Sequence, residues 1–315
     1  MRTDTALPPI RRILVGGPPA GGPGAAEVGI RLAKLLDARL RVVHVQTLHP
    51  LLERLGLRGE RAHPGGASLT DADIIHLAQR EGLAPATYET DTLSGQPRQV
   101  LVNEAKRWQA DLLVLGAHER DEPGVRLGTV AEHLIRNATC PVLVVNGHRP
   151  IPPRRILFPV DLSEFARYAV ACGLNFLAQI GAEQNESMVQ QALLVVPANG
   201  EAADARHRAS LEGLDAWLRQ GALDAALGQS TAEGTPASVI VREALDEEFD
   251  LVVMGTHGHG SHGVIRGGIG SVTGEVLDRA PCHMLIVPPQ AEFGAELADA
   301  VVSQTEPGFT TRFFL

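Results

Sequence analysis

The chain has 315 residues, of which 44% are hydrophobic, 21% are charged and only 4% are aromatic. This length allows two domains of ordinary size, each with a core built mainly from aliphatic side chains. The net charge of -9 argues against a broad nucleic-acid surface, and no apolar run reaches the roughly 18 residues that a membrane span needs.

The N-terminus and the cysteines indicate the compartment. The first residues, "MRTDTALPPIRR", contain no apolar segment of the kind that forms a secretory signal. The three cysteines, Cys140, Cys172 and Cys282, are far apart and odd in number, which fits a reducing cytoplasm. We therefore expect a cytoplasmic protein.

Four landmarks occur twice in the same order along the chain. The pairs are Arg11 and Arg154, Pro97 and Pro236, Asp111 and Asp250, and Cys140 and Cys282, with offsets of 143, 139, 139 and 142 residues. Nearly constant offsets indicate two homologous halves. The joint lies near residues 146–155, which are rich in proline and polar residues. We expect domains at 1–150 and 151–290, followed by a tail at 291–315.

Two features of the first half have simple structural interpretations. The stretch "GGPPAGG", from Gly16 to Gly22, follows the first apolar run but lacks the lysine and the spacing of a P-loop. We interpret it as a loop between a strand and a helix. Further along, Thr129 and Glu132 have the spacing of a capping box, which predicts a helix start at Thr129.

The second half alternates apolar, β-rich runs with segments of helical periodicity. We predict strands at residues 154–160, 191–197, 228–233, 250–255 and 282–288. We predict helices at 162–180, 204–221, 235–248 and 271–280, the first capped by Ser163 and the third opened by Pro236. The first half follows the same order. This alternation predicts two doubly wound α/β domains, each with a parallel sheet covered on both faces.

A glycine-rich stretch, "VVMGTHGHGSHGVIRGGIGSV" at residues 252–272, follows one of these buried strands and leads into a helix. Ligands bind doubly wound sheets at the carboxyl ends of the strands, where the strand order reverses. Glycine lets the backbone approach a ligand closely, and the N–H groups at the start of a helix hold phosphate. The stretch therefore indicates an anion site.

The sequence resembles the universal stress protein family in its tandem form, and the resemblance covers nearly all of both halves. Nucleotide-binding members carry an Asp after the first strand, then Gly-x2-Gly, nine residues, and Gly-Ser or Gly-Thr. Here "FPVD" ends at Asp161, Gly255-Thr-His-Gly258 follows later, and Gly270 precedes Ser271. The resemblance implies a Rossmann-like fold of the adenine nucleotide alpha hydrolase type, in which the last strands of the two domains pair and form an internal pseudo-dimer.

The resemblance also implies a regulatory or stress-response protein that holds an adenine nucleotide in its second domain. ATP is the expected ligand, with AMP, ADP and an accompanying Mg²⁺ left open. Asp161 would recognise the adenine, and the glycine loop would surround the phosphates. The matching positions are Pro159, Asp161, Val196, Met254, Gly255, His257, Gly258, Gly270, Ser271 and Val272.

Both halves depart from the family pattern. Eleven residues, and not nine, separate Gly258 from Gly270 in the second half. In the first half, no Asp follows the first strand, and Glu119 stands at the position of the second glycine. A carboxylate there would repel a triphosphate, so we expect the first half not to bind ATP in this way.

Several alternatives remain at this stage. His257, His259 and His262 could hold a metal ion, although no Cys or carboxylate lies among them. The chain could instead be a nucleotide-free scaffold of the same fold. Neither half has the GxGxxG of a dehydrogenase after its first strand. No residue is nominated as catalytic, so at most slow ATP hydrolysis is expected. A homodimer and a protein partner are left open, as is docking of the tail that ends "PGFTTRFFL".

Overall fold

The computed structural model describes residues 7–16, 24–46, 70–117, 128–182, 187–198, 203–221, 223, 227–258 and 268–289. The first half comprises β1 (Arg12–Gly16), α1 (Gly24–Leu36), β2 (Arg39–Gln46), α3 (Asp71–Arg80), a short 3-10 helix (Pro85–Thr87), β3 (Tyr88–Ser94), α4 (Pro97–Trp108), β4 (Leu112–Gly116), α5 (Thr129–Asn137) and β5 (Val142–Val145). The second half comprises β6 (Arg155–Val160), α6 (Glu164–Gln179), β7 (Val189–Val196), α7 (Ala203–Gln220), β8 (Gly228–Glu233), α8 (Pro236–Asp246), β9 (Leu251–Gly255), α9 (Ser271–Arg279) and β10 (His283–Val287).

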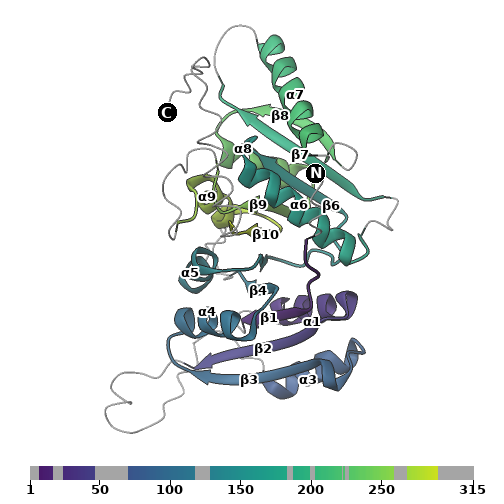
Figure 1. Ribbon diagram of the computed structural model, residues 1–315, viewed down its shortest axis with the longest axis vertical. Coiled ribbons are helices and arrows are strands. Elements are labelled where there is room, and N and C mark those ends of the chain that lie inside the picture. The colour runs from purple at the N-terminus through teal and green to yellow at the C-terminus, as the bar shows by residue number, and fades with distance from the viewer. Residues whose placement is uncertain are drawn as a thin grey trace, which may run out of the picture.

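The strands form one sheet of ten, in the order β3-β2-β1-β4-β5-β10-β9-β6-β7-β8. Neighbours within each half are parallel, whereas β5 and β10 pair antiparallel, with Met284 opposite Val144. The two halves therefore lie end to end along a continuous sheet (Figure 1). The predicted doubly wound fold and the pairing of the two last strands are confirmed.

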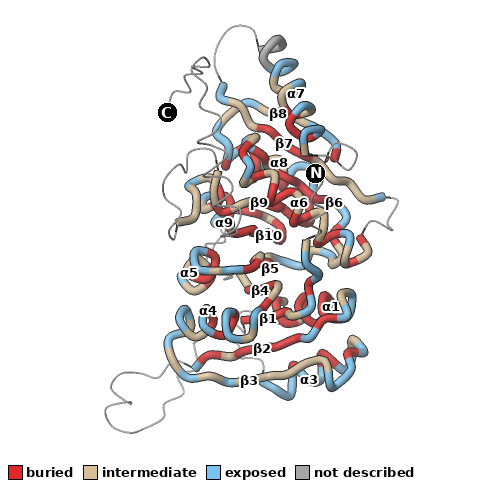
Figure 2. Tube along the Cα trace, viewed as in Figure 1, coloured by how far each residue is buried: buried red, intermediate tan, exposed pale blue. Residues whose placement is uncertain are grey.

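The hydrophobic core is organised by the faces of the sheet. One buried cluster gathers α1, α3, α6 and α7 against the strands, and a second gathers α4, α5, α8 and α9 on the opposite face. Each cluster contains residues from both halves, so the apolar layers run across the joint. The central strands are buried along their length (Figure 2). Burial on both faces explains why their sequences are continuous apolar runs.

The same polar contact begins both halves. Asp111 Oδ2 accepts hydrogen bonds from the backbone N–H groups of Arg11 and Arg12, each at 2.9 Å. Asp250 Oδ2 accepts from the backbone N–H groups of Arg154 and Arg155, at 2.8 and 3.1 Å. Each aspartate thus satisfies the N–H groups at the start of a neighbouring strand. This contact explains the repeated "D" landmark, although the backbone N–H groups that it uses do not require arginine.

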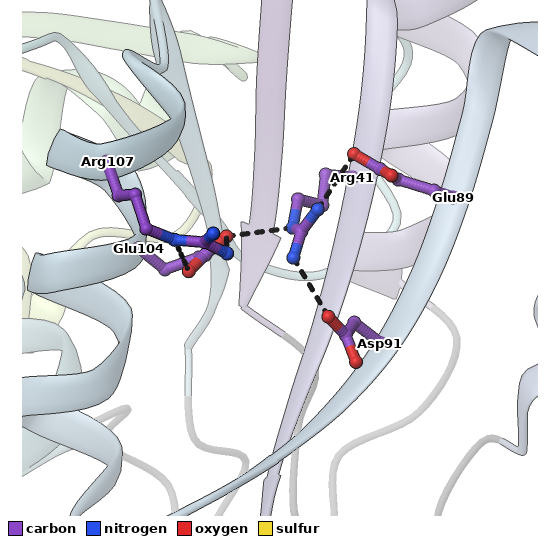
Figure 3. Close-up of polar contacts among 5 residues, drawn as sticks. All are labelled: Arg41, Glu89, Asp91, Glu104 and Arg107. Atoms are coloured by element: carbon purple, nitrogen blue, oxygen red, sulfur yellow. Dashed lines mark hydrogen bonds and ion pairs between the residues drawn. The ribbon is translucent and has the colours of Figure 1, made fainter.

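Ion pairs join β2 and β3, the two outermost strands of the first half (Figure 3). The guanidinium of Arg41 on β2 lies 2.9 Å from Glu89 and 2.8 Å from Asp91, both on β3. It also lies 2.9 Å from Glu104 on α4, which pairs in turn with Arg107 at 2.8 Å. The side chains of Arg41 and Glu104 are only 11% and 5% exposed, so the network is partly desolvated.

One local prediction is wrong. Helix α5 begins at Thr129 with Gly128 as its N-cap and no side-chain capping hydrogen bond, so Thr129 and Glu132 form no capping box. The threonine lies one residue too far along the helix to cap it. Glu132 instead forms an ion pair with Arg136 at 2.6 Å.

Two findings bear on the class of protein. Among the described residues, no helix is both long and apolar enough to cross a bilayer. The three cysteines are free and buried. Burial raises the pKa of the Cys140 and Cys282 thiols to about 12, which keeps both protonated at neutral pH.

Candidate functional site

The predicted site residues lie where the strand order of the second half reverses. From β6 the chain proceeds to β7 and β8 on one side, whereas β9 and β10 lie on the other side of β6. The carboxyl ends of β6 and β9 therefore adjoin, and the chain continues from them into Asp161 and Thr256. This is the position at which doubly wound sheets bind ligands.

Asp161 is held in place by the first turn of α6. Its Oδ1 accepts hydrogen bonds from the backbone N–H and the hydroxyl of Ser163, at 3.1 and 2.5 Å. The same hydroxyl oxygen accepts from the N–H of Ala166 at 3.1 Å, so Ser163 is the N-cap, as predicted. Leu162 between them has φ 62°, in the left-handed region. The carboxylate is thus oriented by a helix cap.

Gly258 lies directly against this carboxylate. A Cβ atom at position 258 would stand 2.4 Å from Asp161 Oδ2, a separation that no real Cβ contact shows. Any other residue would have to displace either the loop or the carboxylate. The structure therefore brings together two predicted site residues that are 97 positions apart in the sequence.

The loop that starts at Thr256 returns to the same point at Gly270. The N–H of Gly270 donates to the carbonyl of Thr256 at 2.7 Å, and the N–H of Thr256 donates to the carbonyl of Val287 at 3.0 Å. The hydroxyl of Thr273 donates to the carbonyl of Gly255 at 2.9 Å. These three bonds fix the start of α9 to the ends of β9 and β10.

The N-terminus of α9 has a glycine cap. Gly270 is the N-cap, with no side-chain capping hydrogen bond from the described residues. The N–H groups of Ser271, Val272 and Thr273 have no acceptor within the helix, because the first intrahelical bond runs from Gly274 to Gly270. In α6, by contrast, Ser163 fills the corresponding role. The start of α9 therefore offers backbone donors and the positive end of a helix dipole.

The remaining predicted residues differ in what they can offer. The side chain of Met254 is buried in a core cluster, so its backbone alone faces the loop. Pro159 and Val196 are half-buried near the ends of β6 and β7, and the carbonyl of Val196 accepts from the N–H of Gly234 at 2.9 Å. His257 Nδ1 lies 2.8 Å from the hydroxyl of Thr256.

The contact between His257 and Thr256 does not make a nucleophile, because Thr256 is only 2% exposed. The imidazole of His257 lies 6.1 Å from the ring of Phe165, at the start of α6. Within the described ranges, no three His, Cys, Asp or Glu side chains are grouped to hold a metal ion. His259 and His262 lie outside those ranges.

The corresponding edge of the first half is built differently. Strand β1 ends at Gly16, where a Cβ atom would stand 2.9 Å from Leu115 Cδ2, so the backbone there is packed closely against an apolar side chain. Helix α5 begins with Gly128 as its N-cap and, like α9, lacks a side-chain cap. The rest of "GGPPAGG" and Glu119 lie outside the described residues.

Comparison with known proteins agrees with this architecture. The model of the Universal stress protein family matches residues 9–146 and again residues 153–288. The chain belongs to this family. Both of its halves are universal stress protein domains by this criterion, and the two matches lie on either side of the joint expected from the duplication.

Relatives of the same family match in sequence and in fold. Universal stress protein Rv2623 of Mycobacterium tuberculosis is 25% identical over 283 residues, which cover 82% of this chain and 91% of the relative. Universal stress protein MJ0531 of Methanocaldococcus jannaschii is 31% identical over 129 residues, covering 38% of this chain and 72% of that protein.

Among solved structures, PA1789 of Pseudomonas aeruginosa, described as functionally unknown, superposes with a TM-score of 0.63 at 19% identity. It covers 94% of this chain and 98% of its own. A universal stress protein from Archaeoglobus fulgidus gives a TM-score of 0.59 at 14% identity, covering 88% and 98%. These two likenesses show the fold.

Proposed function

We propose that the protein is a regulatory or stress-response protein of the cytoplasm that binds ATP in its second half. The observation that supports this most is the glycine-capped N-terminus of α9, which lies at the reversal of strand order together with Asp161. The helix N-terminus suits an anion, and the carboxylate of Asp161 suits a hydrogen-bond donor. An adenine nucleotide carries both, in its phosphates and its exocyclic amine.

The phosphates would lie at the N–H groups of Ser271, Val272 and Thr273, where the helix dipole favours negative charge. Gly270 suits this role because a side-chain cap would occupy the same donors. Gly258 and Gly255 keep the neighbouring backbone free of side chains, and a Cβ at either would come within 3.2 Å of another atom. The glycine positions therefore fit a phosphate cradle.

Asp161 would accept a hydrogen bond from the adenine amine. Its Oδ1 accepts from Ser163, and its Oδ2 is the oxygen on the side of Gly258. A carboxylate fixed by a helix cap loses little further freedom on binding. Mg²⁺ would accompany the phosphates of the nucleotide, since Mg²⁺ commonly keeps its waters and binds few protein oxygens. The first half lacks the aspartate, so we propose a single nucleotide per chain.

The test is calorimetric titration of the full chain with ATP, for the wild type and for Asp161→Asn. Asparagine keeps an oxygen for Ser163 but presents an amide donor, which cannot accept from the adenine amine. We expect ATP affinity to fall about tenfold, because a charged hydrogen bond is lost and a donor faces a donor.

The matched control is Asp246→Asn, at an exposed aspartate at the end of α8. It removes the same charge and should leave ATP affinity unchanged. If the wild type binds no adenine nucleotide, the nucleotide-free scaffold becomes the better account. If Asp161→Asn binds ATP as tightly as the wild type, the role of Asp161 is wrong.

A further inference from the structure

A cavity lies at the amino ends of β1, β2 and β4, away from the residues of the candidate nucleotide site. It has a volume of about 840 Å³. Its walls come from the segment that leads into β1, from the turn between α1 and β2, and from Gln179 at the end of α6. Gln179 Oε1 accepts a hydrogen bond from the N–H of Ile10 at 2.8 Å, so the cavity lies where the two halves meet.

Two guanidinium groups without acidic partners line this cavity. Arg11 and Arg39 both line it, and the backbone N–H of Arg39 donates to the carbonyl of Arg11 at 2.8 Å, although the residue opposite Arg39 in the register of β1 and β2 is Arg12. Both are exposed, and neither side chain forms an ion pair or a hydrogen bond among the described residues. Arg12, by contrast, donates to Gln109 at 3.0 Å and lies 3.9 Å from Asp111.

The acidic groups of the cavity do not neutralise this pair. Asp111 is engaged by the backbone N–H groups of Arg11 and Arg12 and is offset by the guanidinium of Arg12. Asp37 is the other lining carboxylate, in a left-handed turn with φ 48°. Two unpaired cations therefore face one carboxylate. This reverses locally the sign of a chain whose net charge is -9.

We propose that this cavity binds a small phosphate-bearing molecule, at a site separate from the nucleotide site. A guanidinium presents a planar fork of donors that matches phosphate oxygens, and two such forks in one cavity suit a molecule with more than one negative charge. The volume lies within the roughly 300–1,000 Å³ that is usual for small-molecule sites. Pro8, Pro9 and Leu36 provide apolar walls beside the arginines.

Asp37 and the carboxyl end of α1 act against an anion here. Substitutions of the arginines and of Asp37 should therefore change the affinity for an anion in opposite directions. Removing a guanidinium should weaken binding, whereas removing the carboxylate of Asp37 should strengthen it. Asparagine is a suitable replacement at position 37 because it tolerates the left-handed conformation.

The experiment is a titration of the full chain with inorganic pyrophosphate at low ionic strength, followed by NMR of arginine Nε–H signals. The Arg11 and Arg39 signals, assigned from the Arg11→Ala and Arg39→Ala spectra, should shift and reach saturation. The signal of Arg98, an exposed residue on α4, should not. Pyrophosphate should titrate the Arg39 signal of Arg11→Ala and the Arg11 signal of Arg39→Ala several-fold more weakly than in the wild type, and both signals of Asp37→Asn a few-fold more tightly.

Arg98→Ala is the matched control for loss of one exposed positive charge, and it should leave the Arg11 and Arg39 titrations unchanged. Shifts without saturation, or an equal shift of Arg98, would show diffuse attraction and overturn the proposal. Weaker binding in Asp37→Asn would also overturn it. Circular dichroism of each variant separates loss of binding from loss of the fold.

Discussion

At the scale of single residues, His283 on β10 shows how a buried polar group joins the two halves. Its imidazole is completely buried. Nδ1 accepts a hydrogen bond from the backbone N–H of Asn146 at 3.1 Å, and Nε2 lies 3.3 Å from the carbonyl of Arg149. A neutral ring with its proton on Nε2 satisfies both contacts. The residues that follow β5 are thereby tied to the last strand of the second half.

Burial lowers the pKa of His283 to about 4. Between this value and the ordinary pKa of about 6.5, the unfolded chain binds a proton that the folded chain excludes. Folding stability should therefore fall as the pH falls through this window, by about 2 kcal/mol between pH 7 and pH 5 from this residue. Urea unfolding at a series of pH values measures the effect.

Two variants isolate the contribution of His283 to this pH dependence. His283→Asn keeps an acceptor near the position of Nδ1 but does not titrate, so its stability should change less between pH 7 and pH 5. His76→Asn, at an exposed histidine on α3, should retain the slope of the wild type. An unchanged slope in His283→Asn would show that another group is responsible.

The sequence nominates individual candidate residues for the site, but it does not predict the contacts between them. Asp161 and Gly258 were both identified by their place in a pattern, and Ser163 by its place before a helical run. The approach of Gly258 to Asp161 depends on the adjacency of β6 and β9, which no local pattern encodes. Thr129 shows the converse. Thr129 and Glu132 have the residue types and the spacing of a capping box, but the N-cap of the helix is the preceding residue, Gly128.

At the scale of elements, α5 and α9 make a matched pair of helices. Both begin after a glycine N-cap and both lack a side-chain cap. Aspartate at position 128 should add a capping hydrogen bond and raise stability by a few tenths of a kcal/mol. At position 270 the added Cβ would stand 3.2 Å from the carbonyl oxygen of Thr256, so we expect a smaller gain there. The two substitutions should differ in their effect on the nucleotide.

Gly270→Asp should weaken ATP binding at least about tenfold, because the new carboxylate takes the backbone donors and repels phosphate. Gly128→Asp should leave ATP affinity unchanged, since we place no nucleotide in the first half. Calorimetric titration of the two full-length variants provides the comparison. If Gly128→Asp lost ATP binding while Gly270→Asp kept it, the nucleotide would lie in the first half and our assignment would be wrong.

The outer strands of the two halves differ in the polar contacts that join them. Counted from the start of its strand, Gln191 on β7 occupies the position that Arg41 occupies on β2. Gln191 donates a neutral hydrogen bond to Ser230 on β8 at 2.7 Å, where Arg41 forms three ion pairs. This difference could not be predicted from local sequence patterns, because it depends on the register of the outer strands.

Removing these contacts should have unequal costs. Arg41→Gln should destabilise the protein by about 3 kcal/mol, because it leaves several carboxylates close together and one of them desolvated. Gln191→Ala should cost about 1 kcal/mol, the usual value of a neutral hydrogen bond. Urea unfolding of both variants tests the order. Equal losses would show that the ion pairs contribute no more than the neutral bond.

At the scale of the whole molecule, the protein is two family domains joined through one sheet. The duplication and the alternation of strands and helices could be predicted, because repeated apolar runs specify a repeated core. The pairing of β5 with β10 was implied by the resemblance to the family. The cavity of Arg11 and Arg39 could not be predicted, since it forms only where α6 of one half approaches the first strands of the other. The two halves therefore differ both in the residues that they carry at matching positions and in the surroundings of those residues.

Native mass spectrometry of the full chain with ATP and Mg²⁺ tests the central claim most directly. The account predicts one nucleotide per chain in the wild type and a lower occupancy in Asp161→Asn at the same concentration. No bound nucleotide, two per chain, or equal occupancy in the variant would contradict it.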